Sequence, residues 1–368
     1  MSEWRELKLA DLGTFQRGRS RHRPRYAFHL YGGKYPFVQT SEVRTARKYI
    51  KEYEQTYSEV GLEQSKLWPK DTLCIKIAAN IAELAILSFD ACFPDSILGF
   101  IPDEDEADLD FIYYTLTHFQ RELKHIGEGS VQDNINLGTF QDILFPIPSL
   151  PEQKAIASVL SSFDDKIDLL HRQNKTLEAM AETLFRQWFV EELEEDSNTI
   201  FLGDIAYFSN GKSRPEEVPN GSVPIYGGNG ILGYTHQSNS NGFSIIIGRV
   251  GAYCGSLFIE NKPIWISDNA MLAKHINDSS HSYLFYLLKN LRLNEFAEGS
   301  SHPLLTQTLL NSIKIISPSA EKISLFCHET DKWKEKSDFN KLQIETLETL
   351  RDTLLPKLMS GEVRVDYP

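Results

Sequence analysis

The residues in this sequence best suited to chemistry are a run of arginines near the N-terminus. Arginine occupies every second position from 17 to 25, with glycine, serine, histidine and proline between. An extended loop with this pattern can follow the phosphates of a nucleic acid or enter a groove. We therefore predict nucleic-acid contacts at Arg17, Arg19, Arg21, Arg23 and Arg25, with a solvated basic loop as the alternative.

Other side chains of suitable type lie in turn-rich stretches. Arg, Asn and Gln can form paired hydrogen bonds to base edges, and Lys contacts phosphates. Each such residue, taken alone, is more often an ordinary surface residue than a base reader. The further predicted contacts are Lys34, Gln39, Arg44, Arg47 and Lys48 in the first half of the chain, and Lys212, Arg214, Asn229, His236 and Arg249 in the second.

Two motifs imitate those of enzymes but lack the surroundings that the chemistry needs. Residues 228–233 spell G-x-G-x-x-G, yet the turn-rich GYTHQSNSNG from Gly233 onward cannot begin the helix of a dinucleotide site. Asp103, Glu122 and Lys124 imitate a P-D…E-x-K nuclease, but the last two close an amphipathic helix expected over Phe111–His125. A metal-dependent nuclease needs its acids on adjacent strands. We predict a glycine turn and an acidic surface instead.

The other common catalytic motifs are absent from the sequence. It contains no Walker A, H-E-x-x-H, G-x-S-x-G or N-P-P-[YFW] pattern, and its 10 histidines and 4 cysteines form no ligand cluster. We predict that the chain is not an enzyme and holds no metal or cofactor of its own.

Composition indicates a folded cytoplasmic protein with unevenly distributed charge. No apolar run reaches the roughly 18 residues of a membrane span, and the N-terminus has no apolar signal core. Within a net charge of −13, residues 1–51 carry 12 Lys and Arg against 4 Asp and Glu, whereas residues 52–151 carry 5 against 18. Salt screens distant charges within about 8–10 Å, so the overall acidity does not exclude DNA.

An internal duplication organises the chain. LADLGTFQRGRS (9–20) matches LGDIAYFSNGKS (202–213) at an offset of 193, and FIYYTL (111–116) lies over YLFYLL (283–288) at 172. From the EGS sequences at 128–130 and 298–300 onward, the offset is 170. The first copy therefore has about 21 more residues between positions 20 and 73. We expect this unequal part to be a loop region in which recognition differs.

A long helix with heptad patterning follows each globular part. Its apolar residues alternate spacings of four and three, which is a coiled-coil pattern. Ser149 and Glu152 predict a capping box at the start of the first helix. Polar seam residues such as Asn174 and Asn340 tend to fix register. We predict antiparallel pairing through Ile156, Leu160, Phe163, Ile167, Leu170, Asn174, Leu177 and Leu184 of the first helix, and Phe326, Trp333, Asn340, Ile344, Leu347, Leu354 and Leu358 of the second.

The globular parts mix short β-type runs with glycine- and asparagine-rich turns, and each has one amphipathic helix. We expect an α+β fold with two similar domains separated by the paired helices. The predicted division is a first recognition domain at 1–151, a first helix at 152–196, a second recognition domain at 197–318, a second helix at 319–362 and a tail at 363–368.

Over essentially its whole length, the chain resembles the specificity (S) subunit of type I restriction-modification systems. The resemblance rests on the duplication, on GEGSVQDNINLGTFQDILFPIPSLPEQKAIASVLSSFDDKID and ETLETLRDTLLPKLMSGEVRV, and on YGGNGILGYT and ISDNAMLA. It implies two target recognition domains that each read half of a bipartite DNA site, and paired helices that set the spacing and dock two methyltransferase (M) subunits. It also implies restriction (R) subunits, with S-adenosylmethionine, ATP and Mg²⁺ bound by the partners.

The second copy departs from the family pattern where its helix begins. It has PSAEKISLF where the first copy has PSLPEQKAI, and its heptad seam is more polar. Unequal docking of the two M subunits is therefore one expectation. The alternatives are the specificity subunit of a related system with a fused methyltransferase–nuclease, a coiled-coil interaction scaffold without a DNA role, and the nuclease weighed above.

Overall fold

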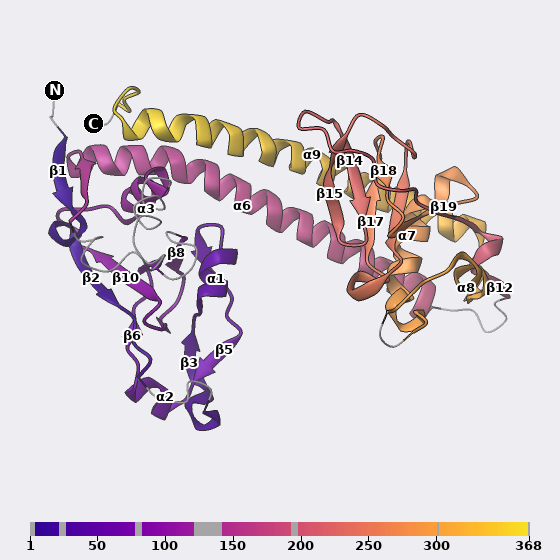
Figure 1. Ribbon diagram of the computed structural model, residues 1–368, viewed down its shortest axis with the longest axis horizontal. Helices are drawn as coiled ribbons and strands as arrows, with labels where there is room; N and C mark the ends of the chain where they lie inside the picture. Colours follow the sequence, from indigo (N-terminus) through magenta and orange to yellow (C-terminus); the bar gives the residue numbers. More distant parts are fainter. Residues whose placement is uncertain are drawn as a thin grey trace. The chain divides into compact units, whose positions relative to one another are not determined.

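The chain forms two compact units (Figure 1). Unit 1 comprises residues 1–169 and 343–368, and unit 2 comprises residues 170–342. Each unit combines β-sheets and short helices with a segment of both long helices, which confirms the α+β class. This computed structural model describes residues 4–21, 27–77, 83–120, 142–192, 198–299 and 302–366.

Unit 1 contains a five-stranded sheet of order β2-β10-β7-β8-β4 and a four-stranded sheet of order β5-β3-β9-β6. A separate antiparallel pair joins β1 to β11. The strands are β1 Arg5–Lys8, β2 Gly13–Arg17, β3 Tyr31–Phe37, β4 Tyr49–Ile50, β5 Gln55–Tyr57, β6 Leu67–Trp68, β7 Leu73–Lys76, β8 Leu84–Leu87, β9 Ala91–Cys92, β10 Ile97–Pro102 and β11 Leu144–Ile147. The short helices are α1 Thr40–Thr45, α2 Glu59–Glu63 and α3 Leu109–His118.

Unit 2 contains a four-stranded sheet of order β13-β19-β16-β17 and a three-stranded sheet of order β15-β14-β18. Here β12 pairs with β20. The strands are β12 Thr199–Phe201, β13 Ala206–Asn210, β14 Val223–Gly227, β15 Gly230–Thr235, β16 Ser244–Gly248, β17 Leu257–Glu260, β18 Trp265–Ile266, β19 Ala270–His275 and β20 Lys314–Ile316. The short helices are α7 His281–Asn290 and α8 Gln307–Ser312.

The central strand of each larger sheet is buried on both faces, because its residues alternate between two hydrophobic clusters. Leu73 and Ile75 of β7 pack with α3 and the start of the first long helix, whereas Cys74 packs with Trp68 and the second sheet. Ile245 and Ile247 of β16 pack toward α7, and Ile246 packs toward the smaller sheet. Continuous apolar runs such as these are typical of strands covered on both sides.

The two units share a strand order, which confirms that the domains are similar. The series β2-β10-β7-β8 corresponds to β13-β19-β16-β17, and β5-β3-β9 corresponds to β15-β14-β18. In the smaller sheets, β3 and β14 each run antiparallel to one neighbouring strand and parallel to the other. Matching side chains also repeat local bonds, since Asp11 accepts from the Lys8 amide at 3.0 Å and Asp204 accepts from the Phe201 amide at 2.8 Å.

The extra length of the first copy lies mainly in residues 38–54, hereafter the insertion. These residues connect β3 to β5 and contain α1 and β4, whereas Gly228 and Asn229 alone connect β14 to β15 in unit 2. The insertion is therefore not only loop, because β4 extends the five-stranded sheet by pairing in parallel with β8.

The long helices are α6, Leu150–Arg186 with a π-helical continuation at Gln187–Glu191, and α9, Ala320–Met359. In unit 1, Leu358 of α9 lies in one cluster with Ile156 and Leu160 of α6. In unit 2, the Asn340 amide donates to the Asn174 side-chain oxygen at 2.8 Å. Residues later in α6 thus contact residues earlier in α9, so the two helices are antiparallel. Every residue predicted for the seam is buried or half-buried.

The first turn of α6 is attached to unit 1 by a buried glutamine. The Gln153 side-chain oxygen accepts from the Asp108 amide at 2.9 Å, and its nitrogen donates to the Glu106 and Pro148 carbonyls at 3.0 and 3.1 Å. Asp108 in turn caps α3. At the matching position unit 2 has Ile323, which packs against an apolar cluster. This contact accounts for the glutamine at the start of the first helix, which an apolar residue replaces in the second.

Candidate nucleic-acid interface

Arg17, Arg19 and Arg21 lie at the end of β2 in unit 1. Gly18 lets the chain pass close to the Phe93 ring, since a Cβ there would lie 2.4 Å from it. The Arg19 guanidinium donates to the Glu63 carbonyl at 3.2 Å, whereas Arg17 and Arg21 are exposed. Arg23 and Arg25 lie outside the described residues.

Lys66 extends this basic region, although nothing in its neighbouring sequence singles it out. Its ammonium lies 3.7 Å from the Trp68 ring centre and donates to the Gln16 side chain at 3.0 Å. Burial first, and the charge of Arg19 second, lower the pKa of Lys66. An incoming phosphate would relieve the repulsion between these two cations.

Lys34 and Gln39 already have partners in unit 1. The exposed Lys34 ammonium pairs with Glu59 at 3.0 Å, and a hydrogen bond to that carboxylate raises the pKa of the lysine. Gln39 precedes α1, where its backbone amide donates to Glu42 at 3.1 Å. Both positions stay predictions, with Lys34 available to DNA only if it leaves Glu59.

Besides Gln39 the insertion contains three predicted contacts, and one of those predictions was wrong. Arg44 and Arg47 are exposed. Lys48 is instead 4% exposed, with its ammonium 3.0 Å from the Asp110 carboxylate. A lysine in a buried ion pair cannot reach a DNA backbone without breaking that pair, so Lys48 is corrected to an internal contact.

In unit 2, the predicted contacts Lys212, Asn229 and Arg249 belong to turns that meet at one end of the sheets. Lys212 lies beside Ser267, and the Arg249 amide donates to the Asn269 carbonyl at 3.1 Å. A Cβ on Gly228, next to Asn229, would lie 3.5 Å from the same carbonyl. Three separate turns therefore converge in this region.

The same turns contain residues that the sequence reading missed. Tyr253 is 52% exposed, and a Cβ on Gly228 would lie 3.8 Å from the Tyr253 Cβ. Asn269 is also exposed. The only sequence signal was the glycine-rich composition of GAYCG and the turn residues S-D-N, which predict turns without showing that the turns meet.

Arg214 and His236 lie elsewhere in unit 2. Arg214 is an exposed residue that pairs with Glu217 and donates to the Leu232 carbonyl at 2.8 Å. His236 follows the end of β15, whereas Asn229 precedes its start. A strand of this length separates its ends by roughly 20 Å, so the two residues do not belong to one compact cluster.

The structure shows the local conformation of the glycine motif at residues 228–233. Gly228 and Asn229 form the turn between β14 and β15, and Gly230 has a φ of +92°. The motif is therefore a hairpin turn, as predicted, and precedes a strand rather than a helix. Of the nuclease-like residues, Asp103 lies just after β10, while Glu122 and Lys124 lie outside the described residues.

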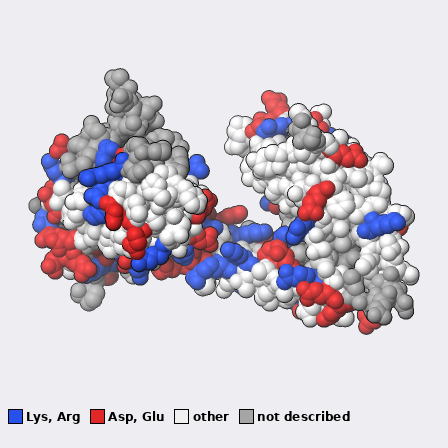
Figure 2. Space-filling model, turned by 90° about the horizontal axis from the view of Figure 1, so that it is seen from below, with Lys and Arg blue, Asp and Glu red and all other residues white. Residues whose placement is uncertain are grey.

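Charge on the face shown in Figure 2 is mixed, with Lys and Arg interspersed among Asp and Glu and wide uncharged areas between. Within the described ranges, no group of three or more His, Cys, Asp or Glu side chains is arranged to hold a metal ion. The helices of those ranges include none that is long and apolar enough to cross a membrane.

Comparison with known proteins shows to which family this chain belongs. A family model for the type I restriction modification DNA specificity domain matches residues 1–179 and 194–354. The chain belongs to this family. The type I restriction enzyme MjaIX specificity subunit of Methanocaldococcus jannaschii is 25% identical, over 99% of this chain and 94% of that protein. The EcoprrI specificity subunit of Escherichia coli is 24% identical, over 87% and 84%.

A solved structure agrees on the fold. The crystal structure of the type I restriction-modification S subunit from M. genitalium superposes with a TM-score of 0.65 at 21% identity, over 97% of this chain and 96% of that one. The family model and the relatives confirm the resemblance to type I specificity subunits, and they group the chain with the non-catalytic subunit of these systems rather than with their methyltransferases or nucleases.

Proposed function

We propose that this specificity subunit reads a bipartite DNA site, with one half-site bound by each unit. The observation that carries the proposal is that two units with one strand order lie in a single chain, and the specificity-domain model matches it in two segments. Two similar readers in one chain fit a target with two halves. The recognition domains of this proposal are residues 1–151 and 197–318, followed by helices at 152–196 and 319–362.

The predicted DNA contacts divide between the units. In unit 1 they are the exposed residues at the end of β2 and on the insertion. In unit 2 they are the side chains of the converging turns, where Arg and Asn can bond base edges. The restriction and methylation chemistry of this proposal belongs to M and R subunits, which bind S-adenosylmethionine, ATP and Mg²⁺, and the complex acts on cytoplasmic DNA.

The outer faces of α6 and α9 support docking of two M subunits. At the repeat offset of 170, Thr176 matches Thr346 and Thr183 matches Thr353, and all four residues are exposed. Between them lie Met180 and Leu350, which are 44% and 46% exposed. Some seam positions also repeat, such as Leu177 and Leu347, whereas others differ, such as Asn174 and Ile344. The repeated exposed positions lie outside the seam, so their similarity favours one kind of partner bound twice.

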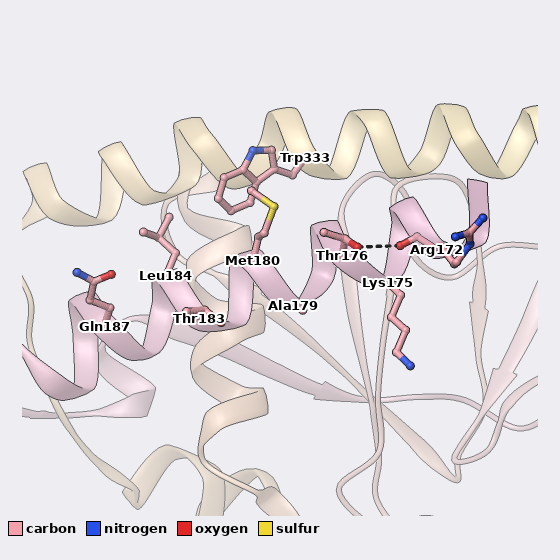
Figure 3. Close-up of a pocket in the computed structure, with 9 residues that line it drawn as sticks. All are labelled: Arg172, Lys175, Thr176, Ala179, Met180, Thr183, Leu184, Gln187 and Trp333. Atoms are coloured by element: carbon pink, nitrogen blue, oxygen red, sulfur yellow. Dashed lines mark hydrogen bonds between the residues drawn. The ribbon is translucent and has the colours of Figure 1, made fainter. Parts of the chain in front are cut away.

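A shallow groove of about 680 Å³ marks this face in unit 2 (Figure 3). Met180 of α6 and Trp333 of α9 point toward each other along it, with Leu184 nearby and Arg172 and Lys175 toward one end. An apolar strip with basic residues at one end fits an amphipathic helix that contains acidic side chains. We propose that the M subunit supplies such a helix.

The proposed function is tested by mapping methylated adenines in cells that contain this chain and its M subunit. We expect one bipartite motif whose methylation disappears when the chain is deleted. A gel shift of the purified S–M complex on DNA with that motif should show specific binding. Absence of any motif that depends on the chain would favour the interaction scaffold, and cleavage by the lone chain with Mg²⁺ would favour the nuclease.

Docking is tested with Met180→Asp and Leu350→Asp. Each substitution places a charge in one of the two repeated strips, so each variant should bind one M subunit by native mass spectrometry, and the double variant should bind none. Val60→Asp is the control, since Val60 is a 49% exposed apolar residue of α2. Two M subunits retained by the double variant would contradict docking on these faces.

A further inference from the structure

The insertion of unit 1 presents two free cations. Arg44 and Arg47 are exposed, and among the described residues neither guanidinium forms an ion pair. This distinguishes them from Arg5, Arg214 and Arg292, which are exposed and paired with glutamates. An exposed and unpaired arginine is free to contact a phosphate, provided that the backbone beneath it is fixed.

A buried lysine fixes the insertion immediately after Arg47. The Lys48 ammonium lies 3.0 Å from the Asp110 carboxylate of α3 and donates to the Ser161 hydroxyl of α6 at 2.9 Å. Ser161 also donates to Asp110 at 3.0 Å. One charge from the insertion is therefore bonded to two helices at once, and the Tyr113 hydroxyl adds a bond to the Arg47 carbonyl at 3.0 Å.

The bonds continue across the helix pair within unit 1. Tyr114 of α3 donates to Asp164 of α6, and Arg351 of α9 pairs with the same carboxylate at 2.6 Å. Beside these contacts a cleft of about 720 Å³ lies between the insertion and the long helices, and an exposed pair of Lys51 with Asp168 of α6 at 2.9 Å lies at its rim. Apolar packing is non-directional, whereas a hydrogen-bonded ion pair fixes distance and angle. The Lys48 contact therefore fixes the insertion against α3 and α6, in addition to the pairing of β4 with β8.

The described residues of unit 2 contain no counterpart of this anchor. Ser282 and Asp331 take the places of Asp110 and Ser161, with the hydroxyl and the carboxylate exchanged between the helices, and they form one hydrogen bond. At the place of the insertion there is only the turn between β14 and β15. The anchored insertion is therefore a feature of unit 1.

We propose that the insertion is a DNA-contacting arm of unit 1, with Arg44 and Arg47 on phosphates, and that Lys48 is the positioning residue that holds the arm on α3 and α6. This inference rests on the proposed function. It assigns a role to the lysine that is not a DNA contact, and it makes the two half-sites unequal in the number of phosphates that the protein binds.

The test measures how the affinity of the S–M complex for its DNA motif depends on salt concentration. Each lost phosphate contact lowers the log–log slope by about 0.9, so Arg44→Ala with Arg47→Ala should lower it by about 1.8. Lys48→Met should lower the slope by a similar amount, and adding the two Ala substitutions to it should change little more. A loss of stability alone would reduce the active fraction and leave the slope unchanged.

Lys51→Met is the matched control, because Lys51 lies in the same insertion and pairs with Asp168 at 2.9 Å on the surface. The slope should be unchanged in this variant, and an equal fall would mean that any lost charge has the same effect, which overturns the anchor. Ser161→Ala keeps the ion pair and gives a milder form of the test if Lys48→Met does not fold.

Full additivity of the Ala and Met substitutions would overturn the positioning role. An unchanged slope in the Ala variant would overturn the arm, whereas failure of the wild type to bind any motif would overturn the proposed function instead.

Discussion

At the scale of single residues, side-chain type predicted chemistry but not burial. Arg47 and Lys48 are adjacent basic residues, yet one is exposed and the other is enclosed by Asp110, Tyr114 and Ser161. Those partners lie 62 or more positions away in the sequence, so no local pattern could separate the two. The repeat comparison likewise could not reveal a bond that both units share. Ser161 donates to Asp110 in unit 1, and Ser282 donates to Asp331 in unit 2. Serine and aspartate have exchanged places between the two copies, so neither position shows a sequence match.

The arginine run gives a prediction at this scale. Replacing Arg17, Arg19, Arg21, Arg23 and Arg25 by alanine should weaken DNA binding and flatten its salt dependence, because each lost phosphate contact lowers the log–log slope by about 0.9. Binding of the S–M complex to its motif, measured from low to moderate salt, checks this. Arg292→Ala, at an exposed residue of unit 2 paired with Glu295, is the control. Unchanged affinity and slope in the five-fold variant would identify the run as a solvated loop.

At the scale of elements, periodicity predicted the long helices well and the sheets poorly. The spacings of four and three needed only local sequence, and α6 and α9 cover most of the expected ranges. The predicted helix over Phe111–His125 is described as α3 up to His118, with residues 121–141 outside the described part. Strands such as β9 and β18 have two residues each and depend on distant partners. Short runs of that kind have no reliable period of their own.

The junction of α6 with the N-terminus of α3 gives a prediction about stability. Gln153 is 0% exposed, and its replacement by alanine removes the partners of the Asp108 amide and of two carbonyls. Leaving buried polar groups unpaired should lower the free energy of unfolding by about 1–3 kcal/mol. Urea unfolding of the variant measures this loss. Gln187→Ala, at an exposed position in the π-helical continuation of α6, should change stability by less than about 0.5 kcal/mol. Equal effects of the two substitutions would contradict the role of Gln153.

At the scale of the whole molecule, the duplication is the feature that the sequence specified most fully. The two copies that align at constant offsets have sheets with the same strand order. The fall of the offset from 193 to 172 between positions 20 and 73 brackets the insertion. The offsets could not show that α1 and β4 form within the insertion, because their partners β7 and β8 come later in the chain. Net charge said little about function, since the basic positions are spread over both units among acidic ones.

The duplication predicts that specificity can be exchanged one half at a time. Replacing residues 197–318 with the same segment of a relative should change one half of the methylated motif and leave the other intact. The reason is that the sheets of unit 2 and their cluster lie within that segment, apart from contributions of the long helices. Mapping methylated adenines in cells with the hybrid checks this. A change in both halves would mean that the two units read DNA jointly.

The last prediction concerns the length of the helices. The heptads run at one offset through both copies, whereas the recognition parts differ in length. Two helices of matched length beside recognition parts of different length are what a spacer between the half-sites requires. One extra heptad in each helix, inserted near Leu177 and Leu347, adds about 10 Å at roughly 1.5 Å per residue. DNA rises about 3.4 Å per base pair, so the half-sites should move apart by about one to three base pairs.

Two physical factors bear on that outcome. A whole heptad preserves the phase of the seam, so pairing of α6 with α9 should survive the insertion. DNA twist opposes the gain, because three added base pairs turn the second half-site by roughly a quarter turn or more at about 10.5 base pairs per turn. Mapping the methylated motif distinguishes the cases. Unchanged half-sites with a longer gap would support a ruler, whereas a fully active complex with the original gap would show that helix length does not set the distance between the half-sites.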